Sequence, residues 1–197
     1  MKRKAVILEK KRLFDGFFKI DAARLQHELP DGSMSEEITR FVFERGDSTA
    51  ALVHDVENQK IILTRQFRYP TLEKDTGWIE EIAAGSLKTG EDPLEGIRRE
   101  LVEEIGYQMQ QSEFIGKCYV SPGGTSERIF LYYATVSPKQ KVSEGGGLDS
   151  EHEHIEILHV PVSEFVRKTL AAEYIDAKTW IAGLWFIANK YSLISRF

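Results

Sequence analysis

The sequence has little of what marks secreted, membrane-bound or disulfide-stabilised proteins. Its 197 residues include one cysteine, Cys118, so an internal disulfide is excluded, and the strand-like context favours a buried thiol. No stretch approaches the roughly 20 apolar residues of a membrane span. The basic N-terminus carries an apolar run, AVIL, that is too short for a signal peptide. We therefore expect a cytoplasmic protein that does not associate with membranes.

Positive charge is also in short supply. Lysine and arginine number 26 against 31 aspartate and glutamate residues, which gives a formal net charge of −5 with both signs interspersed. Proteins that bind nucleic acid use basic stripes to displace counterions from the phosphate backbone, and no such stripe is present. A small anionic molecule held by a few arginines and a metal ion fits this composition better than a nucleic acid does.

What the sequence does contain is the pattern of a mixed β-sheet flanked by helices. Hydrophobic residues make up 42% of the chain, which is enough to bury a core at this length. Two helices are predicted near the C-terminus, with Ser163 and Asp176 as suitable N-cap residues. Apolar and β-branched segments predict strands over residues 49–54, 60–66, 78–83, 114–120, 129–136 and 154–160.

An N-terminal β element precedes this sheet. Two extended segments, 17–29 and 35–43, flank Pro30-Asp31-Gly32, which is a turn signal because proline presets φ and glycine accepts a positive φ. An isolated hairpin is marginally stable in water, so we expect it to pack on the rest of the chain or on a second subunit. We predict two domains, a β element over residues 1–45 that serves dimerisation or substrate binding, and an α/β domain over residues 46–197.

The stretch from residue 85 to 107 carries the strongest chemical signal. The sequence predicts a helix of about three turns here, which begins at the helix-start signal of residues 91–93 and ends before a glycine. Glu100, Glu103 and Glu104 project from one face of it, about 5–6 Å apart at Cβ. Adjacent acids repel unless a multivalent cation neutralises them, and oxygen ligands suit Mg²⁺ or Mn²⁺ better than Zn²⁺. The opposite face offers a sheet the apolar residues Leu94, Ile97, Leu101 and Ile105.

A solvated helix whose acids pair with Arg98 and Arg99 is the ordinary alternative, since most charge runs are no more than that. The stretch nevertheless resembles the Nudix box, and a chance match at a given start is on the order of 10⁻⁸. The one departure is Tyr107, where the family has an aliphatic residue, and it leaves the acids intact. The matching positions are Gly85, then Glu91 after five intervening residues, Arg99-Glu100 after seven more, the apolar Leu101, Glu103-Glu104 after one residue, and Gly106 after one more.

Motifs outside the box resemble those of Nudix ADP-ribose pyrophosphatases over nearly the whole chain. They are Phe14-Asp15-Gly16-Phe17-Phe18, Phe43-Glu44-Arg45-Gly46, Arg65-Gln66-Phe67-Arg68, Ala84, Ser121-Pro122-Gly123-Gly124-Thr125-Ser126-Glu127 and Glu151-His152-Glu153. Each is weak alone, and together they are specific. The resemblance implies an α/β/α sandwich with a mixed sheet, a homodimer, and hydrolysis of ADP-ribose to AMP and ribose 5-phosphate, or of a related nucleoside diphosphate sugar, with Mg²⁺ or Mn²⁺ as cofactor.

The resemblance also implies roles around the metal. Glu151 is the implied general base, Glu103 supports the acidic cluster, and Arg99 orients the glutamates. A zinc site at His152 and His154 is the alternative, but no cysteine lies nearby and the spacing is not that of zinc ligands. The implied metal ligands are the carbonyl of Ala84 and the carboxylates of Glu100, Glu104 and Glu153.

Substrate contacts are expected from arginines, aromatic rings and a glycine-bearing loop. The guanidinium forks of Arg45 and Arg68 match phosphate oxygens in two-point contacts, although a surface ion pair is the alternative for each, as it is for Arg40. Phe17 or Phe18 is suited to stack on adenine, and packing within the hairpin is an equally ordinary use. The expected substrate-binding residues are Phe17, Phe18, Arg40, Arg45, Arg68, Ser86, Ser121, Pro122, Gly123 and Glu127.

Three other functions compete with ADP-ribose hydrolysis. GDP-mannose or another nucleotide sugar is the alternative substrate within the same enzyme class. A non-catalytic ADP-ribose sensor is the second, although such a protein would be expected to have lost metal-binding acids that are present here. RNA decapping is the third, and it predicts a basic groove that the composition does not show.

Overall fold

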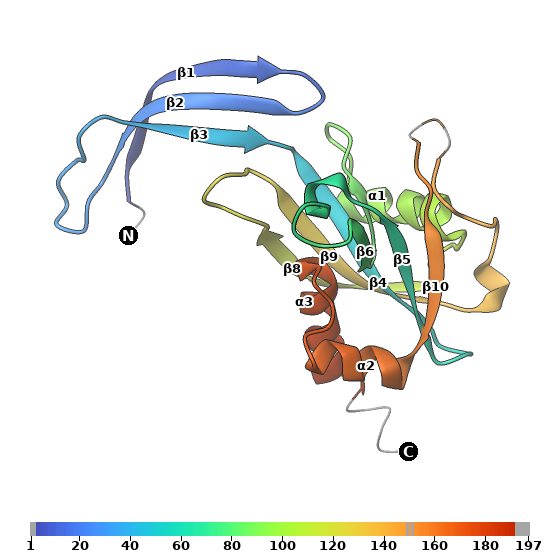
Figure 1. The fold of residues 1–197 in the computed structure, drawn as a ribbon. Coiled ribbons are helices and arrows are strands. Elements are labelled where there is room, and N and C mark those ends of the chain that lie inside the picture. The colour runs from blue at the N-terminus through green and yellow to red at the C-terminus, as the bar shows by residue number, and fades with distance from the viewer. Residues whose placement is uncertain (1–2, 149, 151, 192–197) are drawn as a thin grey trace. The chain divides into compact units, whose positions relative to one another are not determined.

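The computed structural model describes residues 3–148, 150 and 152–191 (Figure 1). The chain forms two compact units, one made of Met1–Asp47 with Tyr119–Arg128 and the other of Ser48–Cys118 with Ile129–Phe197. The predicted functional division at residue 45 stays a prediction. No helix in the described part of the chain is long and apolar enough to cross a membrane.

The first unit contains an antiparallel sheet in the order β1-β2-β3. Strands β2 (Lys19–His27) and β3 (Ile38–Glu44) form the predicted hairpin, paired from Lys19↔Glu44 to Leu25↔Ile38. The sequence did not predict β1 (Ala5–Asp15), which pairs with β2. All the side chains of β1 are exposed, so the strand lacks the alternation of apolar and polar residues by which a half-buried strand is recognised.

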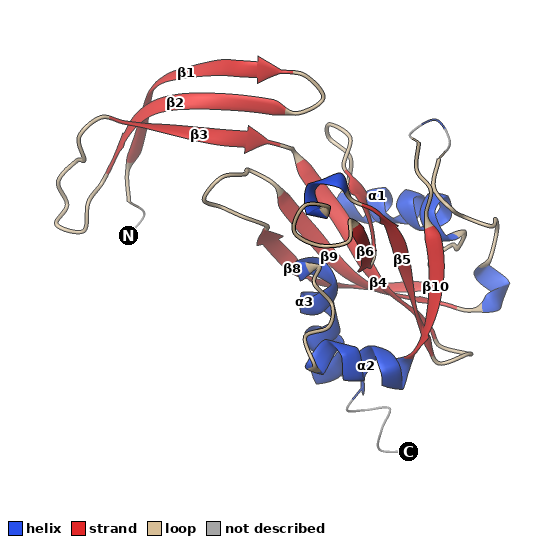
Figure 2. Cartoon of the chain, in the orientation of Figure 1, coloured by secondary structure: helices blue, strands red, loops and turns tan. Residues whose placement is uncertain are grey.

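The second sheet has the strand order β10-β5-β4-β9-β8, with β6 paired to β5 and β7 paired to β4 (Figure 2). It confirms the predicted mixed sheet and the strands predicted in it, with shifted ends, except that the segment over residues 78–83 forms two strands. The strands are β4 (Asp47–Asp55), β5 (Lys60–Phe67), β6 (Trp78–Glu81), β7 (Ala83–Ser86), β8 (Gln111–Tyr119), β9 (Arg128–Val136) and β10 (Glu156–Pro161).

The segment predicted as one strand over residues 78–83 is two short strands with different partners. Strands β4 and β5 pair with each other only near their connecting turn, from Val53↔Ile62 to Asp55↔Lys60. Beyond that point β6 pairs with the end of β5, and β7 pairs with the start of β4. The chain therefore changes partner at Ile82, immediately before Ala84.

Helices cover both faces of this sheet, which confirms the α/β/α sandwich (Figure 2). Helix α1 (Pro93–Glu100) continues as a π-helical turn (Leu101–Ile105) and packs on one face. Helices α2 (Val162–Leu170) and α3 (Ala177–Phe186), with a π-helical turn after α3 (Ile187–Tyr191), cover the other. Short 3₁₀ turns occupy Tyr69–Thr71 and Pro138–Gln140.

The two predicted N-caps have different outcomes. The carboxylate of Asp176 accepts a hydrogen bond from the amide of Thr179 at 2.9 Å, as expected for the start of α3. The prediction for Ser163 is wrong, because α2 begins at Val162 after Pro161 and Ser163 lies inside the helix. Proline at the boundary fixes the backbone entry without a side-chain cap.

Alternate residues of β4 divide between the two cores. Ala50 and Leu52 face α2 and α3, whereas Ala51 and Val53 face α1, as the period of two in a strand requires. All four side chains are fully buried. Cys118 is partly buried against the core beneath α2 and α3, in agreement with the predicted packing role.

A histidine is buried in the same core. His54 is 2% exposed, and its Nδ1 lies 2.8 Å from the hydroxyl of Tyr133. Its Nε2 has no hydrogen-bond partner among the described residues. Burial lowers the pKa of His54, and the nearby charge of Asp55 opposes that shift only in part.

We predict that the His54→Gln variant loses part of the acid sensitivity of the protein. A lowered folded-state pKa means that protons bind preferentially to the unfolded chain, so this histidine reduces stability as pH falls below about 6.5. Chemical denaturation of both proteins at pH 7.5 and pH 5.5 measures the effect. The loss of unfolding free energy on acidification should be smaller in the variant, and an equal loss in both would contradict the prediction.

Candidate functional site

The helix that presents the acidic cluster is fixed at both ends as its sequence predicts. Asp92 accepts hydrogen bonds from the amides of Leu94 at 2.9 Å and Glu95 at 3.3 Å, and Pro93 occupies the first turn. Gly106 ends the π-helical turn with a φ of +78°, a conformation that favours glycine. The apolar residues Ile97, Leu101 and Ile105 are fully buried.

Glu104 is the most deeply buried carboxylate of the cluster. It is 2% exposed, and its Oε2 accepts a hydrogen bond from the amide of Ala84 at 3.0 Å. Burial raises the pKa of Glu104 well above its usual range, and the neighbouring charge of Glu100 raises it further. The backbone of β7 and the helix thus meet at a carboxylate that resists ionisation in the absence of a cation.

Glu100 lies against the same turn of backbone. It is 9% exposed, and a Cβ on Gly85 would come within 1.9 Å of its carboxylate carbon and Oε1. Burial raises the pKa of Glu100 to about 7, although Arg99 acts in the opposite direction. Glycine at position 85 is therefore required by close approach rather than by backbone conformation.

Arg99 holds the outer part of the cluster. Its guanidinium contacts Glu91 at 3.2 Å, Glu100 at 2.8 Å and Glu103 at 2.9 Å. The i,i+4 pair with Glu103 is the one expected of a solvated helix, but here the same arginine also binds two half-buried or buried acids. Arg99 thus contacts three glutamates, and its predicted role of orienting them stays a prediction.

The glycine-rich loop closes over the end of this helix. The amides of Gly146 and Gly147 donate to the carbonyls of Glu104 at 2.9 Å and Glu103 at 3.1 Å. The half-buried Glu153 accepts a hydrogen bond from the amide of Leu148 at 3.4 Å. This loop leads toward Glu151, the predicted general base, which lies outside the described residues.

Arg68 is bound by a partner that the sequence did not reveal, Glu81. Its Nε donates to Oε1 of Glu81 at 2.8 Å, and the other oxygen of Glu81 binds the ammonium of Lys178. The charges of Glu104 and Glu153 also act on Arg68. Glu81 is only 3% exposed. The one signal in the sequence for its role was a glutamate at a position inside a predicted buried strand, since a buried charge needs a partner.

The donor set fits a hard divalent cation. Glu100 and Glu104 are buried carboxylates with raised pKa values, and a cation beside them would remove the mutual repulsion. In the described ranges, no group of three or more acidic, histidine or cysteine side chains is already placed to hold a metal ion. Arg99 holds two of the acids, Glu100 and Glu103, in the present arrangement.

Other predicted substrate residues lie in the first unit. The rings of Phe17 and Phe18 are 4.7 Å apart at their centroids, and Phe17 is 95% exposed. The guanidinium of Arg45 lies over the Phe18 ring at 5.1 Å and 3.8 Å from a carboxylate oxygen of Glu127. This group therefore offers an exposed ring beside a cation, whereas Arg68 and the exposed Ser86 belong to the second unit.

The predicted loop over residues 121–127 pairs with the end of β3. The amide of Phe43 donates to the carbonyl of Gly124 at 2.8 Å, and the amide of Ser126 donates to the carbonyl of Phe43 at 3.2 Å. Ser121 and Pro122 are exposed at the start of the loop. The loop is therefore ordered by backbone hydrogen bonds to a strand of its own unit.

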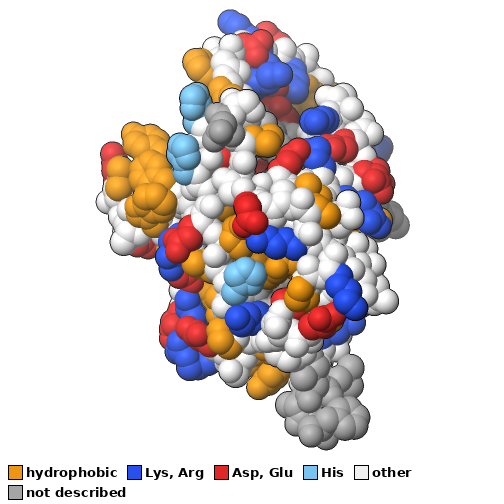
Figure 3. All heavy atoms as spheres, turned by 90° about the vertical axis from the view of Figure 1, so that its right-hand side faces the viewer, with side chains coloured by type: hydrophobic (Ala, Val, Ile, Leu, Met, Phe, Trp, Pro, Cys, Tyr) orange, Lys and Arg blue, Asp and Glu red, His pale blue; other side chains and the backbone are white. Residues whose placement is uncertain are grey.

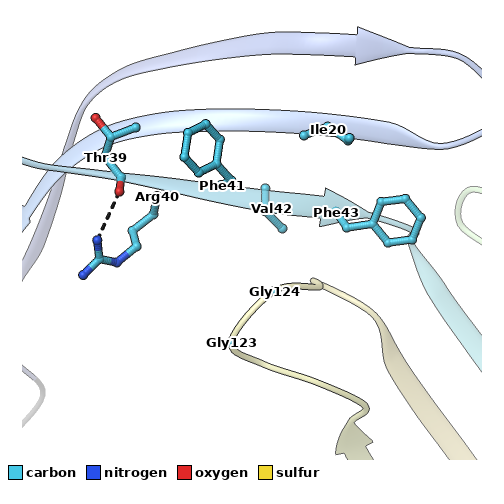
Figure 4. Close-up of a pocket in the computed structure, with 8 residues that line it drawn as sticks. All are labelled: Ile20, Thr39, Arg40, Phe41, Val42, Phe43, Gly123 and Gly124. Carbon is cyan, nitrogen blue, oxygen red and sulfur yellow. Dashed lines mark hydrogen bonds between the residues drawn. The ribbon is translucent and has the colours of Figure 1, made fainter.

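A pocket of about 460 Å³ lies between this loop and β3 (Figure 4). Arg40 extends away from the strand and donates to the carbonyl of Thr39 at 3.1 Å, so its guanidinium keeps free donors. The pocket is lined by Ile20, Thr39, Arg40, Phe41, Val42, Phe43, Gly123 and Gly124.

Acidic and basic side chains are interspersed on the face of the molecule in Figure 3, as the composition predicts.

Comparison with known proteins gives a consistent set of similarities. The sequence profile of the NUDIX domain matches residues 44–181. A GDP-mannose pyrophosphatase of Cronobacter sakazakii is 34% identical over 175 residues, which cover 88% of this chain and 90% of that protein. An ADP-ribose pyrophosphatase of Escherichia coli K12 is 33% identical over 189 residues, which cover 95% of this chain and 90% of that protein.

We predict that Gly85→Ala weakens divalent cation binding while the protein stays folded. The added Cβ would displace the Glu100 carboxylate, and a displaced ligand typically lowers metal affinity by about 10- to 100-fold. Titration calorimetry with Mn²⁺ measures the affinity. Gly116→Ala on β8 is the matched control, because a Cβ there meets no atom within 4 Å, and equal Mn²⁺ affinity in the two variants would contradict the prediction.

Proposed function

The chain belongs to the Nudix family of hydrolases, and we propose that it cleaves the pyrophosphate bond of ADP-ribose, giving AMP and ribose 5-phosphate, or that of a related nucleoside diphosphate sugar. The observation that carries the proposal is the buried Glu100 and Glu104 pair, held against the backbone at Ala84 and facing Arg68. The names of the relatives support the substrate class.

Nudix hydrolases need a divalent cation, and we propose Mg²⁺ as the physiological ion, with Mn²⁺ as a substitute. When bound, the cation would supply a Lewis acid for the phosphates and lower the pKa of the attacking water. Its proposed ligands in this chain are the carbonyl of Ala84 and the carboxylates of Glu100, Glu104 and Glu153.

The basic residues of the site orient the substrate and its acidic neighbours. Arg68 binds a phosphate oxygen and balances the charge that develops there as the bond to the leaving group breaks. Arg99 keeps Glu100 and Glu103 in place without touching the substrate. The exposed Ser86 follows the Ala84-Gly85 backbone and is placed to contact the substrate.

Glu151 is the proposed general base. A carboxylate on the loop that closes over the helix end would accept the proton of the attacking water. Its neighbour Glu153 contributes to the same acidic group, since its charge acts on Glu100, Glu104 and Arg68. Full activity of Glu151→Gln would remove this assignment and leave the rest of the proposal unchanged.

The N-terminal element over residues 1–45 is proposed to bind the nucleoside and to form a homodimer in the cytoplasm. Phe17 or Phe18 stacks on adenine, and Arg45 binds the diphosphate. Together with Arg40 and Glu127, the exposed loop residues Ser121, Pro122 and Gly123 complete the proposed substrate contacts. Exposed apolar residues of the three-stranded sheet support association, among them Ile7 at 63%, Phe14 at 56% and Phe41 at 62% exposure.

GDP-mannose is the second candidate substrate, because relatives with both names share about the same identity with this chain. A panel of nucleotide sugars with Mg²⁺ and with Mn²⁺, assayed for phosphate release after phosphatase treatment, separates the candidates. The sensor alternative is disfavoured because the acids at 100, 103 and 104 are all present and clustered.

We predict that Glu104→Gln lowers kcat for the preferred nucleotide sugar by about 100-fold or more. The amide keeps the shape of the side chain but removes the charge of a proposed metal ligand, so the loss should appear at saturating Mg²⁺. Steady-state kinetics on ADP-ribose and GDP-mannose measure it. Turnover equal to that of the wild type would rule the mechanism out.

We predict a homodimer in solution. Analytical ultracentrifugation at micromolar concentration should give about twice the 22.5 kDa mass of the chain. Ile7→Asp on β1 should shift the protein toward the monomer, because it places a charge among exposed apolar side chains. A monomeric mass for the wild type would contradict the homodimer.

A further inference from the structure

The first turn of α3 contacts the segment that leads to the metal site at two adjacent residues. The hydroxyl of Thr179 accepts a hydrogen bond from the amide of Ile82 at 2.9 Å, at the point where the chain changes from β6 to β7. Thr179 is fully buried and donates its own hydroxyl proton to Asp176. This contact satisfies an amide that lies between the two strands and fixes the backbone before Ala84.

The neighbouring residue of α3 makes the second contact. The side chain of Lys178 is 12% exposed, and its ammonium binds Oε2 of Glu81 and, at 2.9 Å, Oδ1 of Asp176. The pKa of Lys178 is raised, since the two carboxylates outweigh the burial that would lower it. A charged lysine is thus held by one buried carboxylate, Glu81, and one half-buried carboxylate, Asp176.

Lys178 and Arg68 bind different oxygens of Glu81. An arginine and a carboxylate favour a fork in which two N–H groups meet both oxygens. Here Lys178 binds one oxygen of Glu81, and Arg68 uses only its Nε on the other, at 2.8 Å. Its two terminal nitrogens have no hydrogen-bond partner among the described residues, and the side chain is 41% exposed.

We propose that Lys178 is a positioning residue, which holds Glu81 so that Arg68 presents both terminal nitrogens to a substrate phosphate. The inference rests on the proposed function and extends it to α3, far from the acidic helix in the sequence. Without the lysine, the Arg68 guanidinium would turn onto both oxygens of Glu81 and withdraw its terminal donors from the phosphate.

Lys178→Met tests this directly. The expected result is a loss in kcat/KM of about ten- to hundredfold, seen as both a higher KM and a lower kcat, because a charged hydrogen bond to the substrate phosphate is weakened. Lys178→Arg should recover most of the loss, since it restores a cation at Glu81. The affinity for an α,β-methylene analogue of ADP-ribose, measured by calorimetry, should fall by a similar factor without any turnover.

Lys168→Met is the matched control. Lys168 is, like Lys178, a half-buried lysine, 18% exposed in its side chain, and it binds Glu80, the neighbour of Glu81 on β6, at 2.5 Å. Adjacent residues of a strand point to opposite faces, so this pair stabilises β6 from the side away from Arg68. The control should keep kcat/KM within about twofold of the wild type.

A double variant separates positioning from folding. Replacing both partners, in Glu81→Gln with Lys178→Met, leaves no unpaired buried charge and should stay folded in thermal denaturation. Arg68 loses its anchor in this variant, so the rise in KM should persist. A purely structural role predicts normal KM in the folded double variant, and that result would overturn the proposal.

Crystal structures distinguish failure of the inference from failure of the proposed function. If the wild type neither cleaves nor binds any nucleotide sugar, the proposed function fails. The arrangement of Arg68 in the crystal structures still tests the inference. In Lys178→Met, Arg68 should bind both oxygens of Glu81. An unchanged single contact, or kinetics equal to those of Lys168→Met, would overturn it.

Discussion

The burial of two adjacent carboxylates against the backbone at Ala84 and Gly85 is the constraint on which the rest of the site depends. Glu100 and Glu104 are 9% and 2% exposed, and their raised pKa values show that the fold opposes their ionisation. A raised folded-state pKa gives stability at low pH that is lost as pH rises through it, here through about 7 for Glu100. Burial of these acids therefore lowers the stability of the fold near neutral pH and creates a position where a bound cation is favoured.

The split in the sheet follows from that constraint. Strands β4 and β5 separate beyond Val53, and the gap is filled by β6 and β7, which bring the Ala84 amide to Glu104. A continuous strand would stay paired with one partner and carry the chain past the helix. The change of partner leaves the Ile82 amide outside both ladders, and Thr179 of α3 supplies its acceptor. Both faces of the sandwich thus contribute to the position of one short backbone segment.

The sequence predicts those parts of the molecule whose signals are local. The helix is bounded by Asp92, Pro93 and Gly106, all within one stretch, so its ends and its acidic face could be predicted. Strand β1 could not, because its side chains are exposed on every position and carry no pattern. The contact between Glu81 and Lys178 joins residues 97 positions apart, and nothing in either neighbourhood points to the other.

Charge balance explains why the acidic cluster and the arginines need a cation between them. The cluster around Arg68 and Arg99 has more acids than bases, and the proposed diphosphate substrate adds further negative charge. Protons relieve part of the repulsion, as the raised pKa values of Glu100 and Glu104 show. A divalent cation competes for the same oxygens and also attracts the phosphates, which protons cannot do as effectively. The described acids of this cluster are Glu81, Glu91, Glu100, Glu103, Glu104 and Glu153. This excess of acids favours metal-dependent binding of an anionic substrate over binding by arginines alone.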